Sequence, residues 1–194
     1  MAATHPFLGR RVGVVLGGLS AEREVSLNTG AGVVAGLIER GWDAVAIDWT
    51  EGTSLAKLLS DAGVGVVWNA LHGTYGEDGA VQGMLDLMGL PYTHSGMVTS
   101  VIAIDKELTK QALVPHGIPM PGGRIVETRE IFERDPLARP YVLKPVNEGS
   151  SVGVAIVTAE GNYGNPISAD MMLTVESYMA VSRTDLCKWF GVPD

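Results

Sequence analysis

The sequence has little cysteine, little positive charge and no long apolar run. Its single cysteine, Cys187, excludes a disulfide framework and a cysteine-based zinc site, and it fits a reducing compartment. The 14 lysines and arginines are outnumbered by 22 aspartates and glutamates, and the net charge of −8 argues against non-specific nucleic-acid binding, which depends on neutralising phosphates. No stretch approaches the roughly 18 consecutive apolar residues of a membrane span. We therefore expect neither nucleic acid nor membrane as a partner, and any phosphate site must be built locally.

The first apolar run, from Val12 to Leu19, follows two arginines and loosely imitates a signal peptide. It is short and contains glycines, and the charged residues Glu22, Arg23 and Glu24 follow at once, so a buried parallel strand explains it better. With 194 residues and a hydrophobic content of 46%, the chain can form one large domain or two small ones around a real core.

Strand and helix patterns alternate through the first part of the chain. Strands are expected at residues 12–16, 44–48 and 64–71, with a first helix ending near Gly41 and a second over 54–62 capped by Ser54. The apolar residues expected largely on one face of the first helix are Val25, Val33, Val34, Leu37 and Ile38. This βαβαβ order predicts a doubly wound parallel sheet.

Polar residues follow two of these strands, and ligands of such sheets bind beyond the carboxyl ends of the strands. Glu22 follows the Gly17-Gly18 turn after the first strand, and His72 follows the third strand, so both can face one crevice. Two alternatives remain open. His72 can be a structural histidine, and Glu22 can merely favour the N-terminus of the following helix through the helix dipole.

The middle of the chain predicts further helices and a domain boundary. Residues 80–89 should form a helix, 90–93 a short extended piece, and 97–116 one or two helices with Asp105 as an N-cap. Lys106 would lie in a first helical turn, where a cation is unfavourable to the dipole, so it either faces an anion or is simply solvated. The proline- and glycine-rich segment 117–123 places the boundary near 116–121.

Residues 141–157 contain two apolar, β-branched runs around a short polar loop, which predicts a hairpin. Lys144 lies within the first run, where burying an unpaired ammonium is costly. The loop from Gly149 to Gly153 supplies glycines and two serines, whose backbone N–H groups and hydroxyls can approach an anion. A phosphate clamp and an ordinary hairpin whose lysine reaches water explain this pattern about equally well. The P-loop motif does not occur.

The chain from Arg124 onward is expected to form a second, α+β unit. Its tail, 168–194, is less regular than the rest of the sequence, and a helix is expected through residues 172–181. The tail lacks an acidic cluster with metal-ligand spacing.

Several segments together resemble the D-alanine–D-alanine ligase family of the ATP-grasp superfamily. They are LGGLSAEREVSL at 16–27, ALHGTYGEDG and VQGMLDLMGLPY within 70–92, IDK at 104–106, and VLKPVNEGSSVG at 142–153. Several long matches in the family's order are more specific than any single motif, and the resemblance covers roughly residues 10–167. It implies an α/β fold, with an N-terminal pre-ATP-grasp domain over 1–116 and a partial α+β ATP-grasp domain over 117–194.

The resemblance also implies roles for individual residues. Glu22 would hold the ammonium of a first D-alanine, His72 would lie near its carboxylate, and Ser150, hydrogen-bonded with Glu22, would help to orient that network. Nucleotide contacts are implied for Lys106, Lys144, Glu148 and Ser151. Positive groups there would stabilise the charge of a transferring phosphoryl group.

The implied activity is ATP-dependent joining of two D-alanine molecules through an acyl phosphate, for peptidoglycan precursor synthesis in the cytoplasm. ATP and Mg²⁺ or Mn²⁺ would be the cofactors, and a homodimer would form through the first domain. Family members carry a C-terminal unit with most metal ligands, so this chain looks truncated, and only Asp185 of Arg183-Thr-Asp185 resembles a metal ligand. The alternatives are a catalytically incomplete fragment, which binds ligand weakly or pairs with another subunit, and a D-alanine–D-lactate type ligase.

Overall fold

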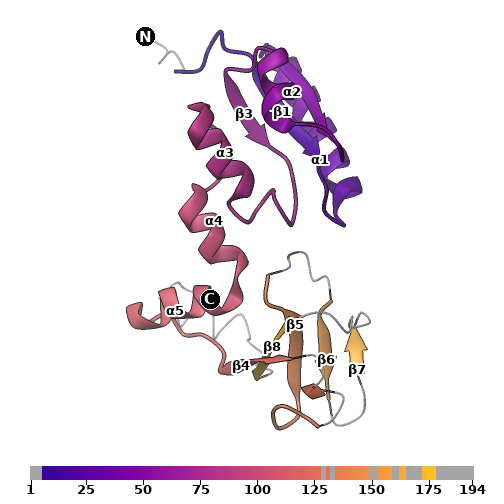
Figure 1. Ribbon diagram of the computed structural model, residues 1–194, viewed down its shortest axis with the longest axis vertical. Coiled ribbons are helices and arrows are strands. Elements are labelled where there is room, and N and C mark those ends of the chain that lie inside the picture. The colour runs from indigo at the N-terminus through magenta and orange to yellow at the C-terminus, as the bar shows by residue number, and fades with distance from the viewer. Residues whose placement is uncertain are drawn as a thin grey trace. The chain divides into compact units, whose positions relative to one another are not determined.

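The computed structural model describes residues 6–127, 130–131, 134–147, 149, 153–158, 162–164 and 172–177. Contacts between residues divide the chain into two compact units, Met1–Val101 and Ile102–Asp194 (Figure 1). The division falls inside helix α4 (Met97–Ile104), whereas the predicted domain limits were 1–116 and 117–194. The two divisions differ in where they place helix α5 (Lys106–Leu113), which the contacts group with the second unit. Within that unit, the backbone N–H of Lys106 donates a hydrogen bond to the carbonyl oxygen of Val146.

The first unit is built on a three-stranded parallel sheet. Its central strand, β1 (Val12–Gly17), lies between β2 (Ala44–Trp49) and β3 (Val66–Asn69), in the order β2-β1-β3. Val12 is in register with Ala44 on one side and with Val66 on the other. The predicted parallel sheet is confirmed, although β3 is shorter than the expected strand over 64–71.

Helices cover both faces of this sheet. α1 (Arg23–Glu39) packs against one face, and α2 (Leu55–Asp61) and α3 (Ala80–Met88) pack against the other. The predicted cap of α2 is confirmed, since Ser54 Oγ accepts a hydrogen bond from the backbone N–H of Lys57.

Two fully buried valines of β1 show why this run forms a central strand. Val15 packs in the cluster that contains Leu59 of α2 and Leu85 of α3, whereas Val14 packs in the cluster beneath α1. Side chains alternate across a strand, so a continuous apolar run is stable only where both faces are covered. Each fully buried valine or leucine contributes roughly 1.5–3 kcal/mol relative to an exposed one.

Helix α1 approaches β1 closely at a glycine. A Cβ atom on Gly30 would lie 2.5 Å from the Cβ of Leu16, so only glycine fits without a shift of helix or strand. The expected apolar face of α1 is partly wrong: Val33, Val34 and Leu37 pack on the core, but Val25 and Ile38 are about half exposed. Small and polar residues occupy the sheet-facing side of the first turns instead.

The segment after α3 covers the outer edge of β3. The backbone N–H of Val67 donates to the Pro91 carbonyl at 2.8 Å, and the N–H of Thr93 donates to the Val67 carbonyl at 3.1 Å. Tyr92 thereby forms a parallel bridge with Val67, which confirms the short extended piece expected over 90–93. Within the described ranges, no helix combines the length and the apolar content needed to cross a membrane.

Helices α4 and α5 confirm the two-helix reading of 97–116. Asp105 is the N-cap of α5, and its Oδ1 accepts hydrogen bonds at 2.9 Å from the backbone N–H groups of Glu107 and Leu108. A short 3-10 helix, η1 (Val114–His116), ends at Gly117.

The second unit contains a five-stranded antiparallel sheet. Its strands, in the order β4-β8-β5-β6-β7, are β4 (Gly123–Glu127), β8 (Met172–Ser177), β5 (Tyr141–Pro145), β6 (Ala155–Val157) and β7 (Asn162–Gly164). The β5–β6 hairpin confirms the prediction for 141–157.

The predicted helix over 172–181 is wrong for the part that the structure describes. Residues 172–177 form β8, which pairs with β4 on one side and β5 on the other. Two ladders of backbone hydrogen bonds outweigh local helix propensity, which differs by less than about 1 kcal/mol per residue. The rest of the tail lies outside the described residues.

Tyr141 anchors the loop before β5. Its hydroxyl donates a hydrogen bond to Asp135 Oδ1 at 2.7 Å, and Arg139 holds the same carboxylate at 2.8 and 2.9 Å. Burial, with the carboxylate as a further cause, raises the pKa of Tyr141 to about 12. Its phenol therefore stays a hydrogen-bond donor at physiological pH.

The Gly30 contact predicts opposite effects for two substitutions in α1. Gly30→Ala should destabilise the first unit by about 1–3 kcal/mol, because the added methyl overlaps Leu16. Gly32→Ala, where nothing lies within 4 Å, should stabilise it by about 0.5–1 kcal/mol, because alanine favours a helix. Urea unfolding of both variants measures this, and equal midpoints for Gly30→Ala and the wild type would contradict the close approach.

Candidate functional site

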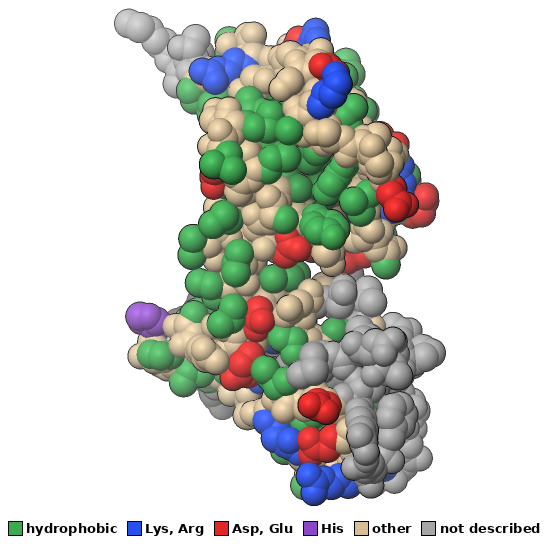
Figure 2. All heavy atoms as spheres, viewed as in Figure 1, with side chains coloured by type: hydrophobic (Ala, Val, Ile, Leu, Met, Phe, Trp, Pro, Cys, Tyr) green, Lys and Arg blue, Asp and Glu red, His purple; other side chains and the backbone are tan. Residues whose placement is uncertain are grey.

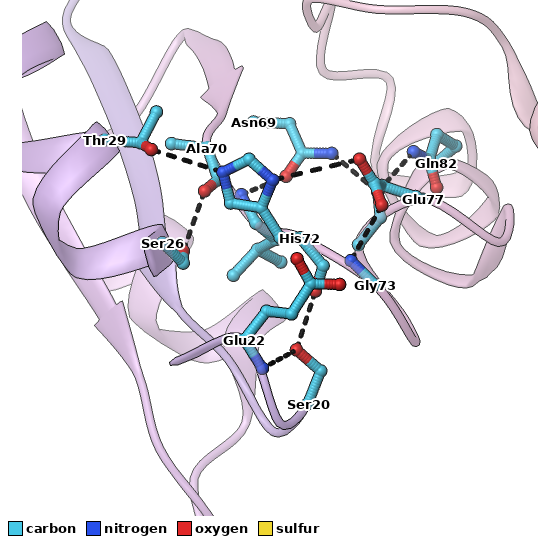
Figure 3. A network of polar contacts seen from close by, with 12 residues as sticks. Ser20, Glu22, Ser26, Thr29, Asn69, Ala70, His72, Gly73, Glu77 and Gln82 are labelled. Atoms are coloured by element: carbon cyan, nitrogen blue, oxygen red, sulfur yellow. Dashed lines mark hydrogen bonds and ion pairs between the residues drawn. The ribbon is translucent and has the colours of Figure 1, made fainter. Parts of the chain in front are cut away.

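The candidate site lies where the carboxyl ends of β1 and β3 meet. Ser20 and Glu22 follow β1, and His72 and Gly73 follow β3, as the strand order predicts (Figure 3). The Ser20 hydroxyl joins the two loops: it donates to the His72 carbonyl at 2.7 Å and accepts from the backbone N–H of Glu22 at 3.1 Å. The fold therefore brings Glu22 and His72 to the same edge of the sheet, as expected from the order of the strands.

The carboxylate of Glu22 is buried without a hydrogen-bond donor in the part of the chain that the structure describes. The residue is only 7% exposed, and neither Oε1 nor Oε2 has a partner among the described atoms. Its side chain points toward the His72–Gly73 loop (Figure 3). Burying an unpaired charge costs far more than burying a neutral polar group, so this carboxylate requires a cationic or donor partner.

Gly73 makes room for that carboxylate. Its φ of +67° lies in the left-handed region, and a Cβ atom there would lie 3.1 Å from Glu22 Oε1. A larger residue would be strained and would crowd the acid.

Helix α1 carries a polar stripe on the side that faces β3. Glu22, Ser26 and Thr29 follow each other at spacings of four and three residues, which places them on one helical face. The fully buried Ser26 hydroxyl donates to the Ala70 carbonyl at 2.7 Å, and Thr29 Oγ1 lies 3.2 Å from His72 Nε2. The sequence motifs alone assign no role to Ser26 or Thr29, although their helical spacing from Glu22 is the signal that places them beside it.

His72 has neighbours at both ring nitrogens. Thr29 lies at Nε2, and Glu77 Oε1 lies 3.9 Å from Nδ1. The other oxygen of Glu77 accepts a hydrogen bond from the backbone N–H of Gly73 at 2.8 Å, so the carboxylate is held in place. The His72 side chain is 28% exposed, which leaves part of the ring accessible to a ligand.

Two buried amides fix the loop that follows Gly73. Asn69 Nδ2 and Gln82 Nε2 both donate to the Gly76 carbonyl, at 2.8 and 2.7 Å (Figure 3). The Asp78 carboxylate also accepts hydrogen bonds from the backbone N–H groups of Tyr75 and Ala80. Tyr75, in a left-handed conformation with φ of +68°, is thereby held in a strained geometry.

An ion pair joins α1 to the end of β2. Arg23 Nη2 donates to both oxygens of Asp48 at 2.8 and 2.9 Å, and Nη1 donates to the Trp49 carbonyl at 2.9 Å. A pocket of about 480 Å³ adjoins this pair, and its lining contains neither Glu22 nor His72. It is lined by Gly18, Leu19, Ser20, Arg23, Thr50, Glu51 and Tyr75.

The predicted nucleotide residues lie in the second unit. Lys106 Nζ donates to the Val146 carbonyl at 3.2 Å, and its backbone N–H bonds the same oxygen. Lys144 lies half-buried on β5, between the buried residues Leu143 and Pro145. The other predicted site residues, Glu148, Ser150, Ser151 and Asp185, lie outside the described residues. Among those described, no group of three His, Cys, Asp or Glu side chains could hold a metal ion.

Comparison with solved structures defines the class of protein. The chain is similar to the D-alanine–D-alanine ligase of Bacillus anthracis, with a TM-score of 0.70 and 34% identity, over 88% of this chain and 58% of that one. It is also similar to that ligase complexed with ATP, with a TM-score of 0.68 and 29% identity, over 88% and 59%. The fold, a parallel α/β unit followed by an antiparallel one, is that of the ATP-grasp ligases, as the resemblance implied.

Sequence comparison defines the family within that class. The family model described as D-ala D-ala ligase N-terminus matches residues 51–95. The D-alanine–D-alanine ligase of Novosphingobium aromaticivorans is 66% identical over 158 residues, which cover 81% of this chain and 50% of that protein. The chain belongs to the D-alanine–D-alanine ligase family, and it spans about half the length of the curated relatives that it matches.

The Ser20 bridge predicts a specific loss. Ser20→Ala removes a donor from the His72 carbonyl and an acceptor from the Glu22 N–H, and should destabilise the first unit by about 1–3 kcal/mol. Amide exchange at Glu22 and Gly73 should accelerate with it. Ser60→Ala, at an exposed position in α2, is the matched control and should change neither quantity. Unchanged exchange at both amides in Ser20→Ala would show that the hydroxyl does not join the loops.

Proposed function

We propose that this chain provides the first D-alanine site, and part of the ATP site, of a D-alanine–D-alanine ligase. In this reaction ATP phosphorylates the carboxylate of one D-alanine, the amine of a second D-alanine attacks the acyl phosphate, and inorganic phosphate leaves. The observation that carries the proposal is the buried carboxylate of Glu22, which lacks a donor within the described residues. Membership of the ligase family supports it.

The amino-acid zwitterion suits the charges around Glu22. An α-ammonium supplies up to three donors and a full positive charge, which would offset the cost of burying the carboxylate. A D-alanine oriented this way can direct its own carboxylate toward the exposed part of the His72 ring. We further propose that Ser150, outside the described residues, helps to orient the same substrate and that Glu22 and Ser150 form the catalytic pair.

The proposed nucleotide contacts are Lys106 and Lys144. Both are half-buried cations in the second unit, and the similar ligase of Bacillus anthracis has been solved complexed with ATP. Their charges would stabilise the β- and γ-phosphates and the transferring phosphoryl group. Glu148 and Ser151 are proposed as further nucleotide contacts.

Magnesium or manganese would neutralise phosphate charge in this reaction, but the described residues do not offer a group of three His, Cys, Asp or Glu side chains for a metal ion, so we assign the metal no ligand among them. Asp185 stays a prediction. We propose a cytoplasmic location and a role in peptidoglycan precursor synthesis, both from the family. Because the chain spans half the length of its relatives, ligand binding and turnover are separate questions.

Two substitutions should separate the two ligands. Glu22→Gln keeps the side-chain shape and removes the charge, so D-alanine affinity should fall about ten- to a hundredfold, while affinity for a non-hydrolysable ATP analogue stays unchanged. Lys144→Ala should lower the affinity for the ATP analogue and leave the affinity for D-alanine unchanged. Isothermal titration of each variant with each ligand gives the four affinities.

Glu24→Gln is the matched control, because Glu24 lies exposed in the same helical turn and should have no effect. If Glu22→Gln no longer binds the ATP analogue but still binds D-alanine, the two sites are wrongly assigned. D-alanine-dependent phosphate release above a Lys144→Ala background would establish turnover by this chain.

We also propose a homodimer that forms through the first unit. Apolar side chains are exposed on neighbouring helices α3 and α4: Leu87 is 93% exposed and Val98 is 65% exposed. Figure 2 shows hydrophobic side chains gathered over this part of the molecule. Monomers rarely expose contiguous apolar patches of this kind, so a second copy is a fitting cover.

The dimer proposal predicts that light scattering at micromolar concentration gives twice the monomer mass. Leu87→Lys should shift the protein toward monomer, because a charge would be buried in the interface. Val25→Lys, at a similarly exposed apolar position on α1, should leave the dimer intact. A monomer in the wild type would contradict the proposal.

A further inference from the structure

His72 carries an unusual neighbour at Nε2. Thr29 is seven residues beyond Glu22 on α1, and its Oγ1 lies 3.2 Å from that nitrogen. A threonine within a helix commonly turns its hydroxyl to a carbonyl of its own preceding turn. The exposed Thr29 directs its hydroxyl to the imidazole instead, across from helix to loop (Figure 3).

Glu77 occupies the other side of the ring. Its Oε1 lies 3.9 Å from Nδ1, and the Gly73 N–H holds its second oxygen at 2.8 Å. A carboxylate only accepts hydrogen bonds and attracts positive charge, so it favours a proton on Nδ1 and disfavours a bare lone pair there. A hydroxyl can donate, so Thr29 suits an Nε2 that carries no proton.

We propose that Thr29 is a positioning residue that holds neutral His72 in the Nδ1–H tautomer and fixes the plane of its ring. In this arrangement the Thr29 hydroxyl donates to Nε2, and the Nδ1–H bond is directed toward the Glu77 side. The opposite tautomer would place two acceptors, the Nδ1 lone pair and the carboxylate, against each other. When His72 gains a second proton, the same hydroxyl rotates and accepts from Nε2–H, so the ring keeps its place in both charge states.

The consequence for ligand binding rests on the proposed D-alanine site. A fixed ring presents the same edge to every incoming substrate, so binding does not have to bear the entropy cost of ordering the ring. Loss of the hydroxyl frees the ring to rotate and to exchange tautomers. The expected cost is that of one neutral hydrogen bond, about a two- to tenfold loss of D-alanine affinity, with the ATP analogue unaffected.

The tautomer can be measured directly on the whole chain. The sequence has four histidines, so long-range ¹H–¹⁵N correlation spectra of protein labelled at histidine contain few signals, and a His72→Gln variant identifies the one of interest. At a pH where His72 is neutral, the wild type should show a protonated Nδ1 and a bare Nε2. Thr29→Val, which keeps the shape and removes the hydroxyl, should move both nitrogen shifts toward the average of the two tautomers. Thr29→Ser should restore the wild-type pattern.

Two results would overturn the inference: a wild-type spectrum with the proton on Nε2, or identical His72 shifts in the wild type and Thr29→Val. Thermal unfolding should be nearly equal in all three proteins, because position 29 is exposed, so a mere loss of stability would not imitate the shift change. A Thr29-dependent tautomer in a chain that does not bind D-alanine would sink the proposed function and leave the positioning role standing.

Discussion

The first unit depends on one constraint, the burial of the Glu22 carboxylate at the start of α1. A charge in that position is stable only if the surroundings are shaped for a partner and kept free of competing contacts. The left-handed Gly73 leaves room beside Oε1, and the Ser20 hydroxyl locks the two loops that enclose the acid. Ser26 and Thr29 continue the same face of α1 and contact Ala70 and His72, which follow β3. The fold is therefore less stable than it could be, because it holds a buried carboxylate that has no hydrogen-bond partner among the described residues.

Much of the fold follows from local rules. Unbroken β-branched runs, glycine turns and cap residues such as Ser54 and Asp105 are decided within a few residues of chain, and they were predicted at the right places. Residues 172–177 were not, because Met, Leu and Glu favour a helix while Thr and Val favour a strand. Their state is set by β4 and β5, two strands distant in sequence.

The site divides in the same way. Glu22 and His72 could be placed at one crevice because parallel strands carry their carboxyl ends to one edge. Asn69 and Gln82 could not, because nothing local indicates that two amides from a strand and a helix share the Gly76 carbonyl. The resemblance to a ligase family supplied the roles of the charged residues, but hydroxyls that support them, at Ser26 and Thr29, became visible only through distances.

The covering of β3 by residues 91–93 has a consequence for the life of the protein in a crowded cell. An uncovered edge strand is a template on which other chains can add strands, and it is a common start of aggregation. Because Val67 already exchanges hydrogen bonds with Pro91 and Thr93, that side of the small sheet offers no free ladder at this position. Growth of the sheet by a foreign strand is thereby directed away from β3, the strand that leads into His72. The loop that carries His72 is thereby protected from misassembly by residues 91–93.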